Sequence, residues 1–212
     1  LGRKNLVEST HQEDVRNQLL IQKWLAIVLL KNAFGGSSDT TLKNLQDVLN
    51  EQSDLSVFPY EAINKKLNID PSFSETEIEN LLVTNYSTKY SYLILSLLYP
   101  DRDWKDNIYH EDHIFPKSEF SVRNLTKRGY DGSKMAEYQK QYNTVANLQL
   151  LTDNENREKH AIPFEQWFPT RDGNFKSRHL IPSVGTYNFD NFLEFIEKKR
   201  SVIREKLKVI SM

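Results

Sequence analysis

Apolar side chains in the first hundred residues recur at intervals of three and four, the spacing that places them on one face of a helix. The longest such run lies between Asp14 and Asn32. A Ser-x-x-Glu pattern at Ser74 and Glu77 marks the start of a later helix, because the hydroxyl and the carboxylate satisfy each other's free backbone donors. The expected helices cover residues 14–32, 40–50, 59–67, a segment that begins at 74, and the nearly all-apolar stretch 90–99.

The pattern changes after residue 103, where helical spacing gives way to short segments rich in His, Asp, Asn and Pro. Pro116 opposes a helix, so the segment before it is expected to be extended. Residues 148–151 predict a short strand, and Thr152 with Glu155 forms a second capping pattern that opens a helix. The order from residue 109 onward is therefore strand, strand, helix. Between the strands, the segment 117–141 is polar and basic, and it is too long for a turn. We expect this segment to be functional or mobile.

These patterns predict an α+β fold that is mostly α, a helical bundle with an embedded strand-strand-helix module. The expected divisions are a polar linker at 1–13, the helical bundle at 14–103, the module at 104–168, and a C-terminal loop and amphipathic helix at 169–212 that packs on the bundle.

Composition narrows the chemistry. The chain of 212 residues has no cysteine, which excludes disulfides, a Cys-type zinc site and a thiol nucleophile, and fits an intracellular location. Its strongest apolar run is shorter than the roughly 20 residues that a membrane span needs. The formal net charge is -1, so any nucleic-acid contact must use local basic clusters. The first residue is Leu, so we expect a segment upstream.

The polar residues of the module suggest a divided site. Neighbouring residues on a strand point to opposite sides, so Asp112 can bind an ion while His113, as a neutral general base, faces a water molecule. Asn156 and His160 are four apart and are expected to share a helical face, which makes Asn156 a second ligand and His160 a candidate third. Such an ion would stabilise the leaving oxygen of a phosphodiester. The remaining assignments are Lys159 or Arg157 on a neighbouring phosphate, and Asn147 on the backbone of the loop that carries His113.

Structural explanations compete with this one. An isolated Asp-His pair is more often hydrogen-bonded for structural reasons than catalytic. A helical His-Glu-x-x-His zinc motif is excluded, because His110 and His113 are three apart. His110 is therefore interpreted as a flanking residue.

Three blocks carry a resemblance to a known family: Asp-His-Ile-x-Pro at 112–116, Asn-Leu-x-Leu-Leu at 147–151 and Asn-x-x-Lys at 156–159. Together they resemble the HNH endonucleases, also called β-β-α-metal or His-Me finger nucleases. The preceding helices and the Phe-rich tail look more closely like the C-terminal nuclease domain of GmrSD-type prokaryotic antiphage restriction proteins.

The resemblance implies His113 as the general base, Asp112 and Asn156 as ligands of a divalent ion, and Asn147 as the organiser of the loop. The ion is expected to be Mg²⁺, or else Mn²⁺, and the substrate DNA. An upstream NTP-linked sensor domain and a cytoplasmic location, without a membrane, are also implied. His160 departs from the commonest pattern of the third block.

Two functions follow as hypotheses. The first is a metal-dependent DNA endonuclease that serves as the effector of an antiphage restriction system. The second is a catalytically degenerate HNH-like module that binds nucleic acid or takes part in assembly.

Overall fold

The computed structural model describes residues 12–36, 38–52, 57–99, 102 and 107–210. The linker expected at 1–13 lies mostly outside these residues, as does the expected boundary near residue 103. The chain forms two compact units, one built on residues up to Phe73 and the other spanning Ser74–Val209.

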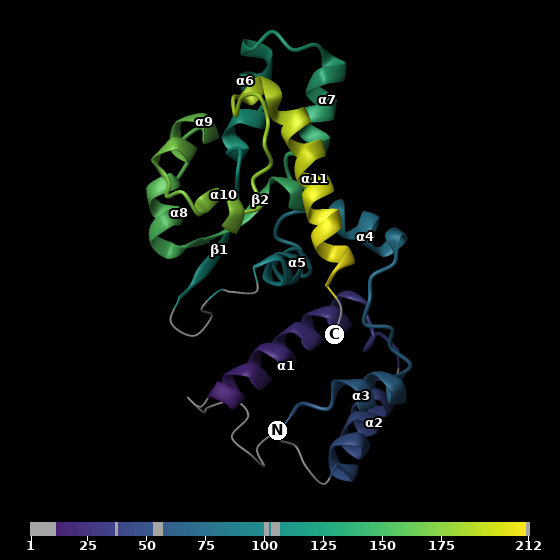
Figure 1. Cartoon of the computed structure of the whole chain (residues 1–212). Coiled ribbons are helices and arrows are strands. Elements are labelled where there is room, and N and C mark those ends of the chain that lie inside the picture. Colours follow the sequence, from purple (N-terminus) through teal and green to yellow (C-terminus); the bar gives the residue numbers. More distant parts are fainter. Residues whose placement is uncertain (1–11, 37, 53–56, 100–101, 103–106, 211–212) are drawn as a thin grey trace. The chain divides into compact units, whose positions relative to one another are not determined.

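The first unit is helical. Its helices are α1 (Gln12–Leu30), α2 (Ser38–Glu51) and α3 (Tyr60–Leu67) (Figure 1). Trp24 is at the centre of its core and packs edge-on against Phe58, with ring centroids 5.3 Å apart. The buried indole nitrogen of Trp24 donates to Oδ1 of Asn64 at 2.8 Å, so this polar group is satisfied within the core.

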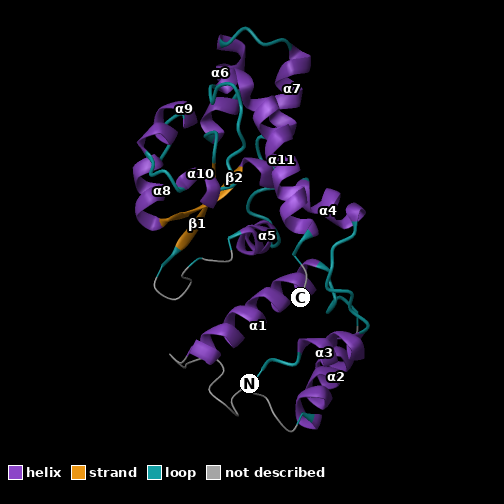
Figure 2. Ribbon diagram, in the orientation of Figure 1, coloured by secondary structure: helices purple, strands orange, loops and turns teal. Residues whose placement is uncertain are grey.

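The second unit contains the strands. Figure 2 shows a two-stranded antiparallel sheet among helices. Its elements in order are α4 (Glu75–Leu82), α5 (Ser91–Leu98), β1 (Tyr109–His113), the 3₁₀ helix η1 (Lys117–Phe120), α6 (Val122–Lys127), α7 (Gly132–Gln141), η2 (Val145–Asn147), β2 (Leu148–Thr152), α8 (Asp153–Lys159), α9 (Phe164–Trp167), η3 (Phe168–Thr170), α10 (Phe175–Arg178), η4 (Phe189–Asn191) and α11 (Phe192–Lys208). Helix α8 contacts both strands, and α5 contacts β2.

Helices α4 and α5 pack with the strand-containing unit. The sequence placed them in a bundle with α1–α3, but both contact η2 and α11, and α11 runs along the same unit. The segment between α4 and α5 also pairs with the chain before β2. There, Asn85 forms an isolated antiparallel bridge with Thr144, and Tyr86 N–H donates to the carbonyl of Asn143 at 2.8 Å. By its contacts, the chain divides after Phe73.

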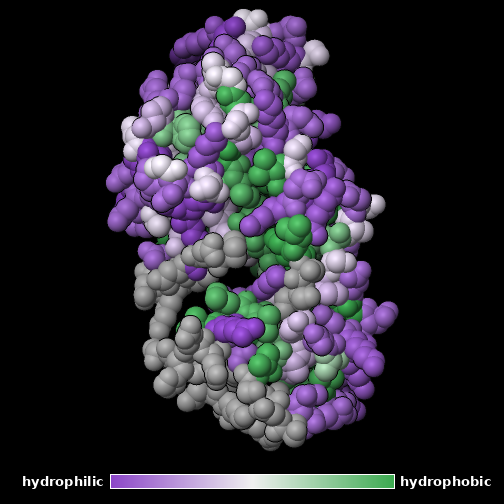
Figure 3. Space-filling model, in the orientation of Figure 1, coloured by the Kyte–Doolittle hydropathy of each residue, from purple (hydrophilic) through white to green (hydrophobic). Residues whose placement is uncertain are grey.

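The segment 117–141 is ordered into η1, α6 and α7. The side chains of Ser121 and Asp131 cap α6 and α7 by accepting from the backbone N–H groups of Asn124 and Lys134. In Figure 3 the surface over this part of the chain is mainly hydrophilic. The polar composition of this segment thus belongs to the exposed faces of two short capped helices.

A cluster of polar side chains is buried between α5, α10 and α11. His179 is fully buried, stacks on Phe175 at 4.0 Å, and has Nδ1 3.1 Å from the hydroxyl of Tyr99. Buried Lys199 of α11 donates to the carbonyl of His179. Burial lowers the pKa of His179 to about 2, helped by the charges of Arg102 and Lys199, and burial lowers the pKa of Lys199 to about 7.

The expected α+β class with mostly helices is confirmed in its broad form. Both capping boxes are present, at Ser74 with Glu77 and at Thr152 with Glu155. No helix in the described part of the chain has the length and apolar character needed to cross a membrane.

Candidate functional site

The two strands set the positions of the candidate residues. The register runs from Tyr109 opposite Thr152 to His113 opposite Leu148, so Asp112 lies opposite Gln149. Since directly opposed residues of an antiparallel pair share a face, Asp112 and Gln149 project together, and His113 projects to the other side. Helix α8 begins at Asp153, immediately after β2, which brings its residues back toward the end of β1.

His113 is held in a nearly closed aromatic environment. Its side chain is 8% exposed, with the ring of Tyr86 at 4.7 Å and the ring of Tyr142 at 6.1 Å. Nε2 lies 3.0 Å from Oδ1 of Asn143. Because an amide oxygen only accepts, Nε2 carries the proton in this contact, and the neutral ring has its lone pair on Nδ1.

The protonation of His113 follows from its burial. Burial lowers the pKa of His113 below its ordinary value, and the hydrogen bond to Asn143 and the charge of Asp112 oppose this only in part. The charges of Lys159 and Lys117 lower it further. His113 is thus neutral at pH 7, as a general base requires, and Nδ1 takes part in no hydrogen bond among the described residues.

Asn147 ties the backbone after His113 to the start of β2. Its side chain is fully buried; Oδ1 accepts from Phe115 N–H at 2.9 Å, and Nδ2 donates to the carbonyls of Phe115 at 3.1 Å and Tyr142 at 2.7 Å. The carbonyl of Asn147 also accepts from Ile114 N–H at 2.7 Å. These contacts suit the loop-organising role expected of Asn147, and they leave its amide no exposed group to meet a substrate.

Asp112 is bound by two buried side chains. Lys159 Nζ lies 2.7 Å from Oδ2 of Asp112, and Gln149 Nε2 donates to the same oxygen at 3.0 Å. Lys159 is fully buried and also donates to the carbonyl of His113 at 2.6 Å. Burial lowers the pKa of Lys159, while the carboxylate of Asp112 opposes the shift. Because Lys159 is buried in this position, its ammonium group does not reach a phosphate in solvent. The expected phosphate-binding role therefore does not fit the burial of Lys159.

Asn156 and Lys159 are three residues apart on α8, so they lie on the same face of the helix. This is the face from which Lys159 contacts Asp112. It is half-buried, and its side chain has no hydrogen-bond partner in the part of the chain that the structure describes. An amide oxygen free in this way is available as a ligand.

His160 does not continue the helix. Helix α8 ends at Lys159, and His160 follows as its C-cap with φ 41°. The shared helical face expected for His160 and Asn156 is therefore not formed, and the exposed His160 ring gains no support as a ligand from helix geometry.

Arg157 is 70% exposed and pairs with Asp153 of the same helix, in addition to donating to Asn154 Oδ1 at 3.0 Å. Asp153 also lies 3.2 Å from Nε2 of His110. Both His110 and Arg157 therefore contact the first turn of α8. Arg157 is the more accessible of the two basic residues proposed for phosphate contact.

The donor set can be compared with the needs of a divalent ion. Mg²⁺ is commonly held by one or two protein oxygens, with water and phosphate completing its shell. Oδ1 of Asp112 enters no hydrogen bond within the described residues, and Asn156 supplies an unpartnered amide oxygen. No group of three His, Cys, Asp or Glu side chains suited to a metal occurs in the residues described. The oxygen donors of Asp112 and Asn156 are of the type that Mg²⁺ and Mn²⁺ prefer.

Sequence reasoning missed three contributors to this site. Asn143 binds the ring of His113, Gln149 binds Asp112, and Tyr86 covers the imidazole. Gln149 lies opposite Asp112 in the strand register, and the sequence alone does not specify that register. Tyr86 comes from a different part of the chain, and no sequence signal links it to His113.

No known protein-family model matches the sequence, and a comparison with curated proteins also finds no match.

Proposed function

We propose that the unit Ser74–Val209 is an HNH-type, metal-dependent DNA endonuclease. The observation that supports this most is the state of His113: a buried neutral imidazole at the end of β1, with one nitrogen bound by Asn143 and the other unbonded. It adjoins Asp112 on the strand and lies next to the helix that carries Asn156. The resemblance of the three sequence blocks to HNH enzymes adds the reaction class and the substrate.

His113 acts as the general base in this proposal. Nε2–H stays bound to Asn143, which fixes the ring, and Nδ1 accepts the proton of the attacking water. The lowered pKa keeps this nitrogen unprotonated at neutral pH. Positioned general-base catalysis of this kind contributes about 10²- to 10⁴-fold in rate. Asn147 keeps the backbone on both sides of the loop in place, so its contribution is to position His113.

Asp112 and Asn156 would hold the divalent ion, with Mg²⁺ as the first choice and Mn²⁺ as the second. When bound, the ion supplies positive charge to the scissile phosphate and to the leaving oxygen. Lys159 holds the carboxylate of Asp112 through Oδ2 and leaves Oδ1 for the ion. Arg157, exposed on α8, is the residue available to a neighbouring phosphate.

The biological setting follows from the resemblance. We propose that the nuclease is the effector domain of a cytoplasmic prokaryotic antiphage restriction system, in which an upstream NTP-linked sensor domain directs it to DNA. The near-neutral charge of the chain fits an effector whose targeting comes from a partner domain.

One observation favours the second candidate, a degenerate module that binds nucleic acid or a partner without cleaving. The carboxylate of Asp112 already has a buried cation, Lys159, 2.7 Å away, and this pair would also serve a purely structural role.

A plasmid-nicking assay separates the two. With Mg²⁺ or Mn²⁺ the full chain should convert supercoiled plasmid to nicked or linear form, and EDTA should abolish the conversion. His113→Ala should remove activity, while His110→Ala, a half-buried histidine on the same strand, should retain it. Cleavage that survives His113→Ala would remove the assignment of the base. Absence of cleavage with either metal would favour the binding module.

A further inference from the structure

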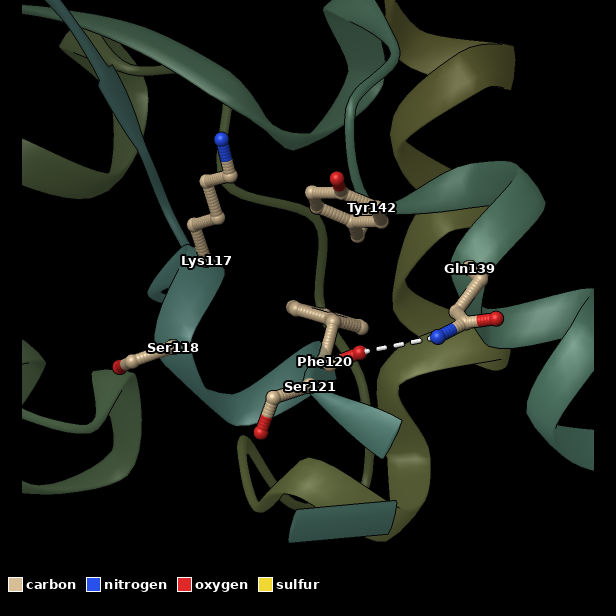
Figure 4. Close-up of a pocket in the computed structure, with 6 residues that line it drawn as sticks. All are labelled: Lys117, Ser118, Phe120, Ser121, Gln139 and Tyr142. Carbon is tan, nitrogen blue, oxygen red and sulfur yellow. Dashed lines mark hydrogen bonds between the residues drawn. The ribbon is translucent and has the colours of Figure 1, made fainter. Parts of the chain in front are cut away.

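A hollow close to His113 is not used by the catalytic proposal. It has a volume of about 590 Å³ and is lined by Lys117, Ser118, Phe120, Ser121, Gln139 and Tyr142. Figure 4 shows Lys117, after β1, and Tyr142, at the end of α7, on opposite sides of it, with Phe120 between them. The hollow thus opens between two helical segments that follow the strand of the candidate base.

Stacked rings connect this hollow to the base. The ring of Tyr142 lies nearly parallel to that of His113 at 6.1 Å and nearly parallel to that of Phe120 at 5.0 Å. Phe120 is buried, and its ring centroid lies 4.6 Å from that of Phe192. The part of the hollow formed by Phe120 is therefore packed into the core. Gln139 Nε2 donates to the carbonyl of Phe120 at 3.4 Å and joins the two walls (Figure 4). A group bound here would lie next to the reacting position and not at a distant surface.

The charge of the hollow is positive. Lys117 is exposed and has no ion-pair or hydrogen-bond partner among the residues that the structure describes. None of the six lining residues is acidic, and nearby Glu119 is paired with Arg128 at 3.0 Å. The segment 117–141 has six basic and three acidic side chains, a formal charge of +3 in a chain whose net charge is -1. The charge of Lys117 is also one of the smaller causes that lower the pKa of His113.

We propose that this hollow binds the sugar–phosphate backbone of the DNA strand next to the scissile phosphate, and this inference rests on the proposed function. Lys117 meets a phosphate, and the Tyr142 hydroxyl and the serine hydroxyls of the rim donate to phosphate or sugar oxygens. The contacts are made to the backbone, so they position the strand and do not read its sequence. The site would align the nucleotide chain so that one phosphate falls before Nδ1 of His113.

Binding measured without cleavage tests this. Fluorescence anisotropy of the full chain with short fluorescein-labelled DNA duplexes of two unrelated sequences, in EDTA, gives Kd at several salt concentrations. Lys117→Gln should raise Kd by about tenfold for both sequences. It should also reduce the slope of log Kd against log salt by about 1. Tyr142→Phe keeps the stacked ring and should raise Kd by about threefold. Lys140→Gln removes an exposed lysine of α7 that does not line the hollow, and it should leave Kd nearly unchanged.

The outcomes separate this site from the nuclease proposal. Equal effects of Lys117→Gln and Lys140→Gln, or no binding of either duplex by the unmodified chain, would overturn the site. If the unmodified chain nicks plasmid and Lys117→Gln changes neither Kd nor the KM for nicking, the site is wrong and the nuclease proposal stands. If the expected binding pattern is found but no metal supports nicking, the DNA site stands and the nuclease proposal fails.

Discussion

The ammonium of Lys159 lies 2.7 Å from Oδ2 of Asp112 and 2.6 Å from the carbonyl oxygen of His113. One buried side chain at the end of α8 therefore holds both neighbouring residues at the end of β1. The sequence suggested that this lysine binds phosphate, whereas the contacts make it a support for the two residues assigned to the ion and the base. The indole ring of Trp167 also lies close to this lysine, with its centroid 5.7 Å from Nζ.

The first prediction concerns this ion pair. Lys159→Met leaves the carboxylate of Asp112 largely buried without its cation and should lower the free energy of unfolding by about 3–5 kcal/mol. Urea denaturation followed by circular dichroism measures the change, and Lys140→Met, at an exposed position of α7, should stay within about 0.5 kcal/mol of the unmodified chain. The double variant Asp112→Leu with Lys159→Met should recover much of the loss, because no unpaired charge remains. A double variant as unstable as Lys159→Met would show that the charge pair is not the cause.

The second prediction concerns Asn147. Asn147→Ala removes three side-chain hydrogen bonds and leaves the N–H of Phe115 buried without its acceptor, so the unfolding free energy should fall by about 2–4 kcal/mol. Asn124→Ala, which loses one exposed bond to the carbonyl of Ser118, should cost no more than about 1 kcal/mol. Similar losses in the two variants, measured by denaturation, would argue against a special role for Asn147 in the loop.

The third prediction concerns the pKa of His113. Asn143→Asp replaces a neutral acceptor with a carboxylate 3.0 Å from Nε2 in the present geometry, and the negative charge should raise the pKa of His113. NMR titration of the ring proton of His113 measures this directly. If the chain nicks DNA, the acidic limb of the pH–rate profile should move to higher pH by the same amount. A ring titration that stays in place would mean that Asn143 does not face the imidazole in solution.

The fourth prediction concerns stability in mild acid. His113 and His179 both have folded-state pKa values below the ordinary 6.5, so the unfolded chain takes up protons first as the pH falls. The unfolding free energy should therefore decrease as the pH falls below 6.5, by up to about 1.4 kcal/mol per pH unit for each histidine. His179→Gln should flatten the slope between pH 6.5 and the region near pH 5 where carboxylates begin to titrate. Denaturation curves collected across this range that show no slope would contradict the buried neutral state of both rings.

Local patterns in the sequence predicted the elements well. The two capping boxes and the Leu148–Leu151 strand are present because short-range hydrogen bonding and β-propensity decide them. The extended segment before Pro116 is also strand, as β1. In contrast, the polar segment 117–141 is expected from the sequence to be functional or mobile, and the helices η1, α6 and α7 within it are not predicted. Their polar faces dominate the composition, and Leu125 and Tyr138 are the buried residues of α6 and α7.

The candidate site was predictable only where chain neighbours define it. Asp112 and His113 are adjacent, and their divergence follows from the strand. The partners of these residues, Asn143 and Gln149, depend on the pairing register and on the packing of η2, which a single sequence does not specify. The burial of Lys159 likewise depends on how α8 packs against the strands, which the sequence alone does not specify.

The bridge between Asn85 and Thr144 limits where the proposed nuclease module can be cut from the chain. It holds the segment that contains Tyr86 against the chain before β2. The ring of Tyr86 forms an aromatic wall over His113, and in the chain it comes before both helix α5 and strand β1. A fragment starting at residue 104 would lack this wall and expose the imidazole to water. The pKa of His113 would then return toward that of a free histidine. Measurements on this fragment would therefore describe a base with a different pKa from that of the full chain. A fragment of residues 74–209 corresponds to the second compact unit and keeps the wall.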